Sequence, residues 1–374
     1  MQFLPNEQQA MIQRGVRKFA ESTLKTGATQ RDAAGTTPRL VLKQLAELGV
    51  FGLTVPEESG GLGLDSVAVA LALEELAAAD AGLALFVLQH LSLSIGHMQA
   101  VNLGPEQLGW LSAMASGQAL CVWAHGEDAL HRDADTVGLR ATRDGDGWRL
   151  NGVKPNVFGA GLAEVAIVTA QTDEGLCAFG LQFATEGVTV AQSTEPLGLR
   201  SIGVADIAFA NVRVTAGALF GAAGQADKAV AVALRQARLG IAAISVGVAR
   251  EALRLAGRYA NERQQFGKPI ATFQPIQWQV ANSAVEIDVA RLLLHRAAWA
   301  VDHTKNADGL VAMARLTAAE TATRVTDRAI QLHGGYGYTR EFTVERLYRD
   351  AWTLESLFGS PGLQRVLLAK SLAA

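Results

Sequence analysis

Apolar residues recur at spacings of three and four from about Asn6 to Gly117, as in the set Leu40, Leu42, Leu45 and Leu48. This spacing places apolar side chains on one face of a helix, and alanine is frequent in the same stretch. The segment 56–63, Pro-Glu-Glu-Ser-Gly-Gly-Leu-Gly, interrupts the pattern, because three glycines and a proline destabilise any helix. We therefore expect a helical region with a loop at 56–63, followed by a helix from Val67 to Ala79.

The pattern changes between about Gln118 and Gly224, where short β-prone runs alternate with turns. The runs are Gly147 to Leu150, Val165 to Ala170 and Ala205 to Val214, and Asp-Gly-Asp-Gly at 144–147 separates two of them. Such runs bounded by glycine and aspartate are typical of strands joined by tight turns. The sequence predicts an antiparallel β domain.

The helical period returns after Gln225 and persists to the end of the chain. Alanine- and leucine-rich stretches cover Val230 to Ala260, Phe273 to Val301 and Leu310 to Leu332. Long helices with short connections predict a bundle. We expect three domains, 1–117, 118–224 and 225–374, an organisation that fits several families and assigns no function by itself.

Composition excludes several classes of protein. The 374 residues carry 33 Lys and Arg against 36 Asp and Glu, without the basic stripe of a nucleic-acid-binding domain. Cys121 and Cys177 have no CxxC spacing and no neighbouring histidine cluster, so we expect buried free thiols and no metal site. The amino terminus lacks the blocks of a signal peptide, and the cleanest apolar run, Leu239 to Ala249, is shorter than the ~20 residues that span a bilayer. We expect a cytoplasmic protein with no membrane or nucleic-acid partner.

Two motifs in the last third carry candidate chemistry. Residues 261–270 read Asn-Glu-Arg-Gln-Gln-Phe-Gly-Lys-Pro-Ile and precede Phe273 and Gln274. Residues 331–341 read Gln-Leu-His-Gly-Gly-Tyr-Gly-Tyr-Thr-Arg-Glu, and Glu-Arg-Leu-Tyr-Arg-Asp-Ala follows at 345–351.

Together these segments resemble the acyl-CoA dehydrogenase family, flavoproteins that oxidise the α,β bond of acyl thioesters and pass the electrons to an electron-transferring flavoprotein. The resemblance runs the whole length of the chain and includes the loop 56–63, the turn Pro-Leu-Gly-Leu-Arg-Ser at 196–201 and the glycine-rich loop 334–337. It implies a multidomain α and β fold with an N-terminal helical domain, a central β-barrel and a C-terminal four-helix bundle. The bundle of the family drives assembly into a dimer or tetramer.

The resemblance also implies an intact site for the adenylate and pyrophosphate of FAD. In the family these groups, on a neighbouring subunit's FAD, are held by an arginine and a phenylalanine, a glutamine and a glycine pair. The matching residues here are Arg263, Phe266, Gln331, Gly334 and Gly335, and Gln274 and Ser360 also match the family pattern. A fixed guanidinium and close-approaching backbone suit a dianionic pyrophosphate.

The contacts to the flavin ring are replaced. Where the family reads Thr-Glu-Pro and then Gly-Ser-Asp, residues 126–133 read Gly-Glu-Asp-Ala-Leu-His-Arg-Asp, so that only Glu127 and Asp133 match. Where the family reads Asn-Gly-x-Lys-x-Trp-x-Thr, residues 151–158 read Asn-Gly-Val-Lys-Pro-Asn-Val-Phe. Three polar residues lie in or directly before segment 126–133: His125, His131 and Arg132. They form either a new polar site or part of a surface loop without a functional role.

The family's catalytic base is also missing. Removing the α-proton of an acyl thioester requires a base within hydrogen-bond reach of it and a flavin that takes the β-hydride. The family places a glutamate in Tyr-Glu-Gly-Thr, and the matching residue here is Phe358; the other glutamate position in the family matches Ala237. Glu355, three residues before Phe358, is the best local substitute, with a solvated helix position as the plainer interpretation. Arg238 matches an arginine near the thioester in the family, with an ordinary salt bridge as its alternative role.

The adenylate site is intact, whereas the ring contacts and the catalytic base are missing. Three hypotheses follow from this combination. The chain is the subunit of a heteromeric acyl-CoA dehydrogenase that supplies the adenylate end of a shared FAD site, while a homologous subunit supplies the ring contacts and the glutamate. Heterotetrameric members of this kind act on bulky substrates such as steroid side-chain thioesters, which suggests lipid or steroid degradation. Alternatively, the chain is a homo-oligomeric enzyme with other chemistry, such as flavin oxygenation, a lyase step or a non-redox reaction, or it is a binding protein without flavin.

Overall fold

The computed structural model describes residues 5–126 and 137–373. Its first part is helical, as the spacing of apolar residues predicts. Side chains cap three of the helices: Asn6 forms a capping box with Gln9 at α1, and Asp65 and Asp80 accept from backbone N–H groups at α4 and α5. The helical elements are α1 (Glu7–Phe19), η1 (Ala20–Leu24), α2 (Lys25–Ala34), α3 (Arg39–Glu47), α4 (Ser66–Ala77), α5 (Ala81–Leu88), η4 (Gln89–Ile95), α6 (Gly96–Gln99) and α7 (Pro105–Ala115).

The middle part is a seven-stranded sheet with the order β1-β4-β2-β3-β7-β6, in which β5 pairs with the other edge of β4. The expectation of an antiparallel domain is wrong along one edge of β4, because β1 and β2 both run parallel to β4, with Cys121 opposite Val165 and Arg140 opposite Gln171. Parallel neighbours need a long crossover, and the chain forms the β2–β3 hairpin between β1 and β4. The strands are β1 (Cys121–Ala124), β2 (Arg140–Asp144), β3 (Gly147–Phe158), β4 (Val165–Thr172), β5 (Gly175–Gln182), β6 (Val188–Gln192) and β7 (Val204–Val214).

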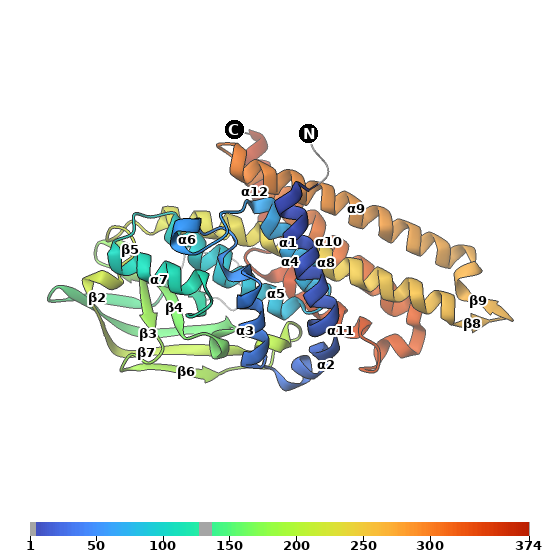
Figure 1. The fold of residues 1–374 in the computed structure, drawn as a ribbon, viewed down its shortest axis with the longest axis horizontal. Coiled ribbons are helices and arrows are strands. Elements are labelled where there is room, and N and C mark those ends of the chain that lie inside the picture. The colour runs from blue at the N-terminus through green and yellow to red at the C-terminus, as the bar shows by residue number, and fades with distance from the viewer. Residues whose placement is uncertain (1–4, 127–136, 374) are drawn as a thin grey trace.

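The last part is the expected set of long helices, which lie side by side and extend away from the sheet (Figure 1). A small hairpin, β8 (Gln264–Gln265) and β9 (Lys268–Pro269), projects from the far end of the two longest helices (Figure 1). The helical elements are α8 (Asp227–Glu262), α9 (Gln274–His303), α10 (Asp308–His333), η9 (Gly334–Tyr338), α11 (Val344–Ser356) and α12 (Pro361–Ala373).

The turn 196–201 joins the three parts. The Leu199 backbone N–H donates to Asp350 Oδ1 of α11 at 2.6 Å, and Ser201 Oγ donates to Asp80 Oδ1 at 2.6 Å. Thr37 Oγ1 donates to the Ser201 carbonyl at 2.7 Å. Because these groups are buried, their bonds fix the sheet against both helical parts.

Two helical stretches are long and apolar enough to cross a membrane by length and composition alone, Ala81–Gln99 and Asp227–Glu262. Their most apolar windows are 94% and 72% buried inside the protein, as in the core helices of a soluble protein. The second continues on both sides of the apolar run Leu239 to Ala249 and agrees with the expected helical stretch Val230 to Ala260. Cys121 and Cys177 are buried free thiols, as predicted.

Candidate functional site

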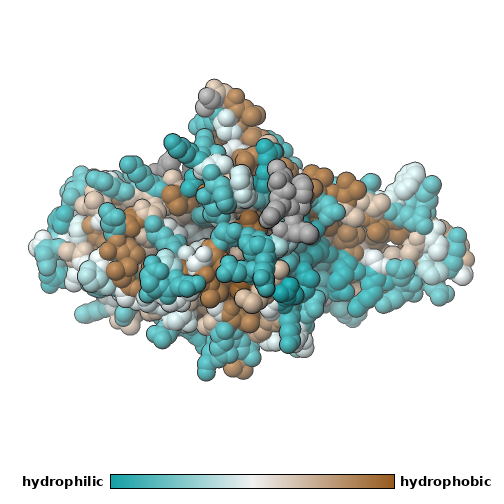
Figure 2. Space-filling view, turned by 45° about the horizontal axis from the view of Figure 1, so that its top comes forward, coloured by the Kyte–Doolittle hydropathy of each residue, from teal (hydrophilic) through white to brown (hydrophobic). Residues whose placement is uncertain are grey.

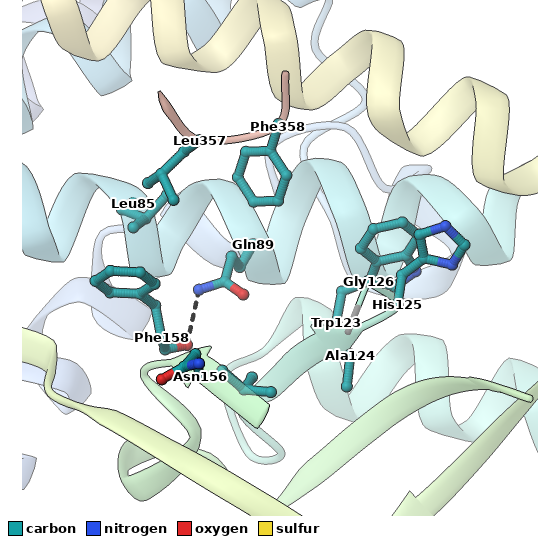
Figure 3. A pocket seen from close by; sticks show the side chains of 11 residues that line it. Leu85, Gln89, Trp123, Ala124, His125, Gly126, Asn156, Phe158, Leu357 and Phe358 are labelled. Atoms are coloured by element: carbon teal, nitrogen blue, oxygen red, sulfur yellow. Dashed lines mark hydrogen bonds between the residues drawn. The ribbon is translucent and has the colours of Figure 1, made fainter. Parts of the chain in front are cut away.

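A small cavity lies where the sheet meets the helices (Figure 3). Its walls come from α5 and η4, from the end of β1, from the end of β3 and from the loop after α11. The cavity volume is about 20 Å³, which is room for roughly one water molecule. The lining residues are Leu85, Gln89, Trp123, Ala124, His125, Gly126, Asn156, Val157, Phe158, Leu357 and Phe358.

Phe358 points into this cavity from the loop between α11 and α12 (Figure 3). Its side chain is buried, and its backbone has φ +52°, a left-handed conformation that is unfavourable for a bulky residue. The lining residues that the structure describes include no aspartate or glutamate. A phenyl ring accepts no proton, so this side chain cannot take the role of the family's base.

Polar side chains from other helices hold the loop in place. Arg315 of α10 is fully buried, and its Nη2 donates to the carbonyls of Leu354, Glu355 and Leu357 at 2.7, 3.1 and 3.1 Å. Gln364 Nε2 donates to the Gly359 carbonyl at 3.2 Å. Burial, together with the nearby Arg238 charge, lowers the pKa of Arg315 to about 10. These bonds satisfy the carbonyls at the end of α11 and fix the loop that follows.

Glu355 does not reach the cavity. Thr323 Oγ1 of α10 donates to Glu355 Oε2 at 2.6 Å, and Glu355 is not among the lining residues. The carboxylate therefore bonds to the neighbouring helix on the other side of the loop. Its alternative role as a substitute base is not supported by this geometry.

Arg238 lies in α8 behind the same loop. Its Nε donates to the Phe358 carbonyl at 3.4 Å, so it contacts the loop backbone, and it forms no salt bridge with residues 5–126 or 137–373, in contrast to the ordinary salt bridge considered from the sequence. Burial lowers the pKa of Arg238, and the charge of Asp308 opposes this effect. Ser360 lies at the start of α12, where its Oγ accepts from the Leu363 backbone N–H at 3.4 Å.

The end of β3 is tied to the helices across the cavity. Gln89 Nε2 donates to the Phe158 carbonyl at 2.8 Å (Figure 3). Gln89 is the first residue of the π-helical segment η4, and such segments occur frequently at functional sites. Sequence analysis missed Leu85, Gln89 and Trp123, because only their spatial position next to Phe358 identifies them.

His125 is the one member of the predicted polar group that the structure places. Its ring stacks on Trp123 with centroids 4.8 Å apart, and its Nδ1 lies 2.8 Å from Thr169 Oγ1 of β4. Lys154 Nζ donates to the His125 carbonyl at 2.7 Å. His125 is thus a buried, hydrogen-bonded wall of the cavity. The other residues named there from the sequence lie outside the described part of the chain: Glu127, His131, Arg132 and Asp133.

A second group of predicted residues lies at the far end of the bundle. Phe266 and Gly267, with φ of +52° and +77°, form the two-residue turn of the β8–β9 hairpin, and the Phe266 side chain is 92% exposed. Arg263 precedes the hairpin and Gln274 begins α9, both exposed. The Arg263 side chain makes no ion pair with any residue of 5–126 or 137–373. An arginine and an aromatic ring are thus presented outward at this end.

The glutamine and the glycine pair lie at the end of α10, next to the hairpin end of α8. Tyr259 of α8 stacks on His333 of α10 with ring centroids 4.3 Å apart, which brings these helix ends together. Gln331 and both glycines are exposed, Gly334 has φ +59°, and a Cβ at either glycine would meet no atom within 4 Å. The open backbone at this point can approach a phosphate group closely.

Comparison with known proteins identifies the family of the whole chain. Three profiles of one family match successive parts of the chain: the acyl-CoA dehydrogenase N-terminal domain at 6–118, the middle domain at 126–212 and the C-terminal domain at 228–373. The chain belongs to the acyl-CoA dehydrogenase family. The expected family and its three-part fold are therefore confirmed.

Similar members of the family share the full length of this acyl-CoA dehydrogenase chain. The probable acyl-CoA dehydrogenase YngJ of Bacillus subtilis (strain 168) is 35% identical, with 100% of each chain covered. The butyryl-CoA dehydrogenase of Megasphaera elsdenii has 30% identity and a TM-score of 0.96, again over 100% of both chains. The caffeyl-CoA reductase-Etf complex subunit CarC of Acetobacterium woodii is 32% identical over 98% of each chain.

The cofactor of the family is FAD. The glutaryl-CoA dehydrogenase of Mycobacterium smegmatis, with 28% identity and a TM-score of 0.92 over 98% and 95% of the two chains, was solved in complex with FADH2. The residues of this chain fit one end of such a cofactor: the outward Arg263 and Phe266 and the open glycine pair suit an adenylate and its pyrophosphate. They do not fit the flavin ring, because Gly126, Asn156 and Phe158 stand where the family pattern has hydroxyl and tryptophan side chains.

Proposed function

We propose that this chain is the subunit of a heteromeric acyl-CoA dehydrogenase that lacks the catalytic carboxylate and supplies the adenylate end of a shared FAD site. The observation that carries the proposal is the pairing of two facts: Phe358 fills the base position in the cavity, while Arg263, Phe266 and the glycine pair remain exposed. A homologous subunit supplies the glutamate and the ring contacts. The substrate of the complex is an acyl-CoA thioester.

The chemistry explains why both subunits are needed. When bound, the flavin accepts a hydride from the β-carbon of the thioester, while a carboxylate takes the α-proton. The described cavity residues of this chain include no carboxylate, so no step of proton removal is assigned to it. Its residues bind and orient the far end of the cofactor, which gives the complex affinity without reaching the reacting carbons.

The exposed face of α9 supports assembly with another chain. Apolar side chains recur there at a spacing of seven, which is the repeat of packed helices. The corresponding surface is hydrophobic along the upper right of the molecule, where α9 runs (Figure 2). These residues are 47 to 63% exposed in the single chain: Trp278, Val285, Val289, Leu292 and Trp299. We propose that this α9 stripe is covered by the helices of the partner subunit in a dimer or tetramer.

The remaining partners follow from the same family. We propose that the complex works in the cytoplasm and passes its electrons to an electron-transferring flavoprotein. The similarity to the caffeyl-CoA reductase-Etf complex subunit CarC supports the second of these two proposals. This partner would meet the flavin of the complex and not the isolated chain.

Purification of the chain alone, and then together with the product of a neighbouring dehydrogenase gene, tests the proposal. We expect no FAD on the isolated chain and one FAD per pair of subunits in the mixture, measured by flavin absorbance after denaturation. FAD bound to every chain of the isolated protein would instead identify a homo-oligomeric enzyme. Its absence from both preparations would identify a protein that binds no flavin.

A further inference from the structure

Two aromatic side chains and one amide line the cavity at the place where, by resemblance to the family, the flavin ring would lie. Phe158 enters from the end of β3, Phe358 from the loop after α11, and Gln89 from η4 (Figure 3). The cavity volume that remains is about 20 Å³. Ligand pockets commonly measure about 300 to 1,000 Å³, so the remaining space is more than tenfold too small for a three-ring flavin.

The structure holds these side chains in place by bonds to their backbones. The Phe358 carbonyl accepts from Arg238 Nε, and Arg315 holds the carbonyls before it. The Phe158 carbonyl accepts from Gln89 Nε2 at 2.8 Å, and Gln89 is only 3% exposed. This partly buried bond resists opening, because breaking it leaves the buried Gln89 amide without its partner.

We propose that Phe158 and Phe358 form an internal plug, latched by Gln89, that excludes a flavin ring from this subunit's own half-site. This inference deepens the proposed function, and the role of the plug within the complex rests on that function. A pair of subunits then holds one flavin, because the second ring position is filled by the protein itself. The half-site is closed by identifiable side chains, so it can be reopened by replacing them.

Lumiflavin tests the plug on the isolated chain. This molecule is the flavin ring without ribityl or adenylate groups, so its binding depends on the ring half-site alone and needs no partner subunit. We expect no saturable quenching of lumiflavin fluorescence by the wild-type chain. The double variant Phe158→Thr with Phe358→Ala should bind lumiflavin at least tenfold more tightly than the wild type.

Matched variants separate opening of the plug from general loosening. Phe179→Ala removes a buried ring of β5 that does not line the cavity, and it should bind no better than the wild type. Gln89→Ala removes only the latch, and it should give a smaller but measurable gain. It serves as the test if circular dichroism shows that the double variant is unfolded.

The outcomes distinguish the plug from the proposed function. Lumiflavin binding by the wild type, no gain in folded cavity variants, or an equal gain in Phe179→Ala would each overturn the plug. If the wild-type complex still carries one FAD per pair, the proposed function survives such a result. FAD on every isolated wild-type chain would overturn the proposed function itself.

Discussion

The substitution Phe266→Asn should stabilise the isolated chain and weaken FAD binding by the complex. Phe266 and Gly267 both have positive φ in the two-residue turn between β8 and β9. A turn of this geometry favours Asn-Gly, since asparagine tolerates the left-handed conformation that is unfavourable for phenylalanine. The native residue is therefore suboptimal for the turn.

The size of the effect follows from three contributions. Left-handed backbone costs an ordinary L-residue roughly 1 to 2 kcal/mol, and asparagine recovers part of this. The ring is 92% exposed, so its removal sacrifices little burial. Its edge-to-face contact with Phe273, at 6.2 Å between centroids, contributes about 0.5 kcal/mol at such an exposed site. We expect a net gain of about 0.5 to 1 kcal/mol in the free energy of unfolding.

Two measurements check this reasoning. Urea denaturation of the isolated chain, followed by far-UV circular dichroism, should show a higher midpoint for Phe266→Asn. Calorimetric titration of the flavin-free complex should show FAD binding weakened at least tenfold. Phe266→Tyr keeps the ring and the strained backbone, and it should match the wild type in both assays. A less stable Phe266→Asn chain would show that the ring packs within the subunit, and unchanged FAD affinity would refute its contact with the adenylate.

Three further substitutions test the rest of the structure. Burial raises the pKa of Asp350 to about 6, above its usual 3.8, so its favourable contribution is present at low pH and lost as the pH rises through about 6. Asp350→Asn should therefore gain up to about 3 kcal/mol relative to the wild type as the pH rises from about 4 to about 6, with little further change above that, seen as a pH-dependent difference in Tm. Arg250→Met removes bonds of 3.0 and 2.6 Å to the buried Glu75 carboxylate and should cost about 3 kcal/mol in urea denaturation. Leu292→Asp in the α9 stripe should lower the assembly mass in light scattering, whereas Met11→Asp, equally apolar and 59% exposed on α1, should not.

Periodicity predicted the long helices because they are amphipathic over many turns. The expected helix Val67 to Ala79 corresponds to α4 (Ser66–Ala77), and the stretch Val230 to Ala260 lies within α8. Pairing between strands is a different problem. The parallel contact of Cys121 with Val165 joins residues far apart in the sequence, and local alternation contains no information about which strand lies beside which.

In the candidate site, too, local motifs could be predicted from the sequence, whereas contacts between distant segments could not. A motif identifies Arg263 and Phe266 because the residue types and their spacing are specific. The direction of Glu355 depends instead on Thr323 of another helix, and the place of Gln89 depends on a π-helical turn that has no clear sequence pattern. The plug could not be predicted either, because a sequence does not give the volume that remains between packed side chains.

Phe358→Glu decides whether the missing base is the only defect of this subunit. The new carboxylate would enter a cavity lined by Leu85, Leu357 and Phe158, where burial raises its pKa and Phe158 still occupies the ring position. We expect the isolated variant, supplied with FAD, to leave butyryl-CoA unoxidised in a dye-reduction assay. Proton magnetic resonance in deuterated water should likewise show no exchange of the α-protons until Phe158→Thr is added. Oxidation by the single variant would mean that a flavin ring already fits, because hydride transfer needs the ring beside the β-carbon. The plug would then be wrong and the ring contacts would not need a second subunit, but the wild-type chain would still need a partner that supplies the base.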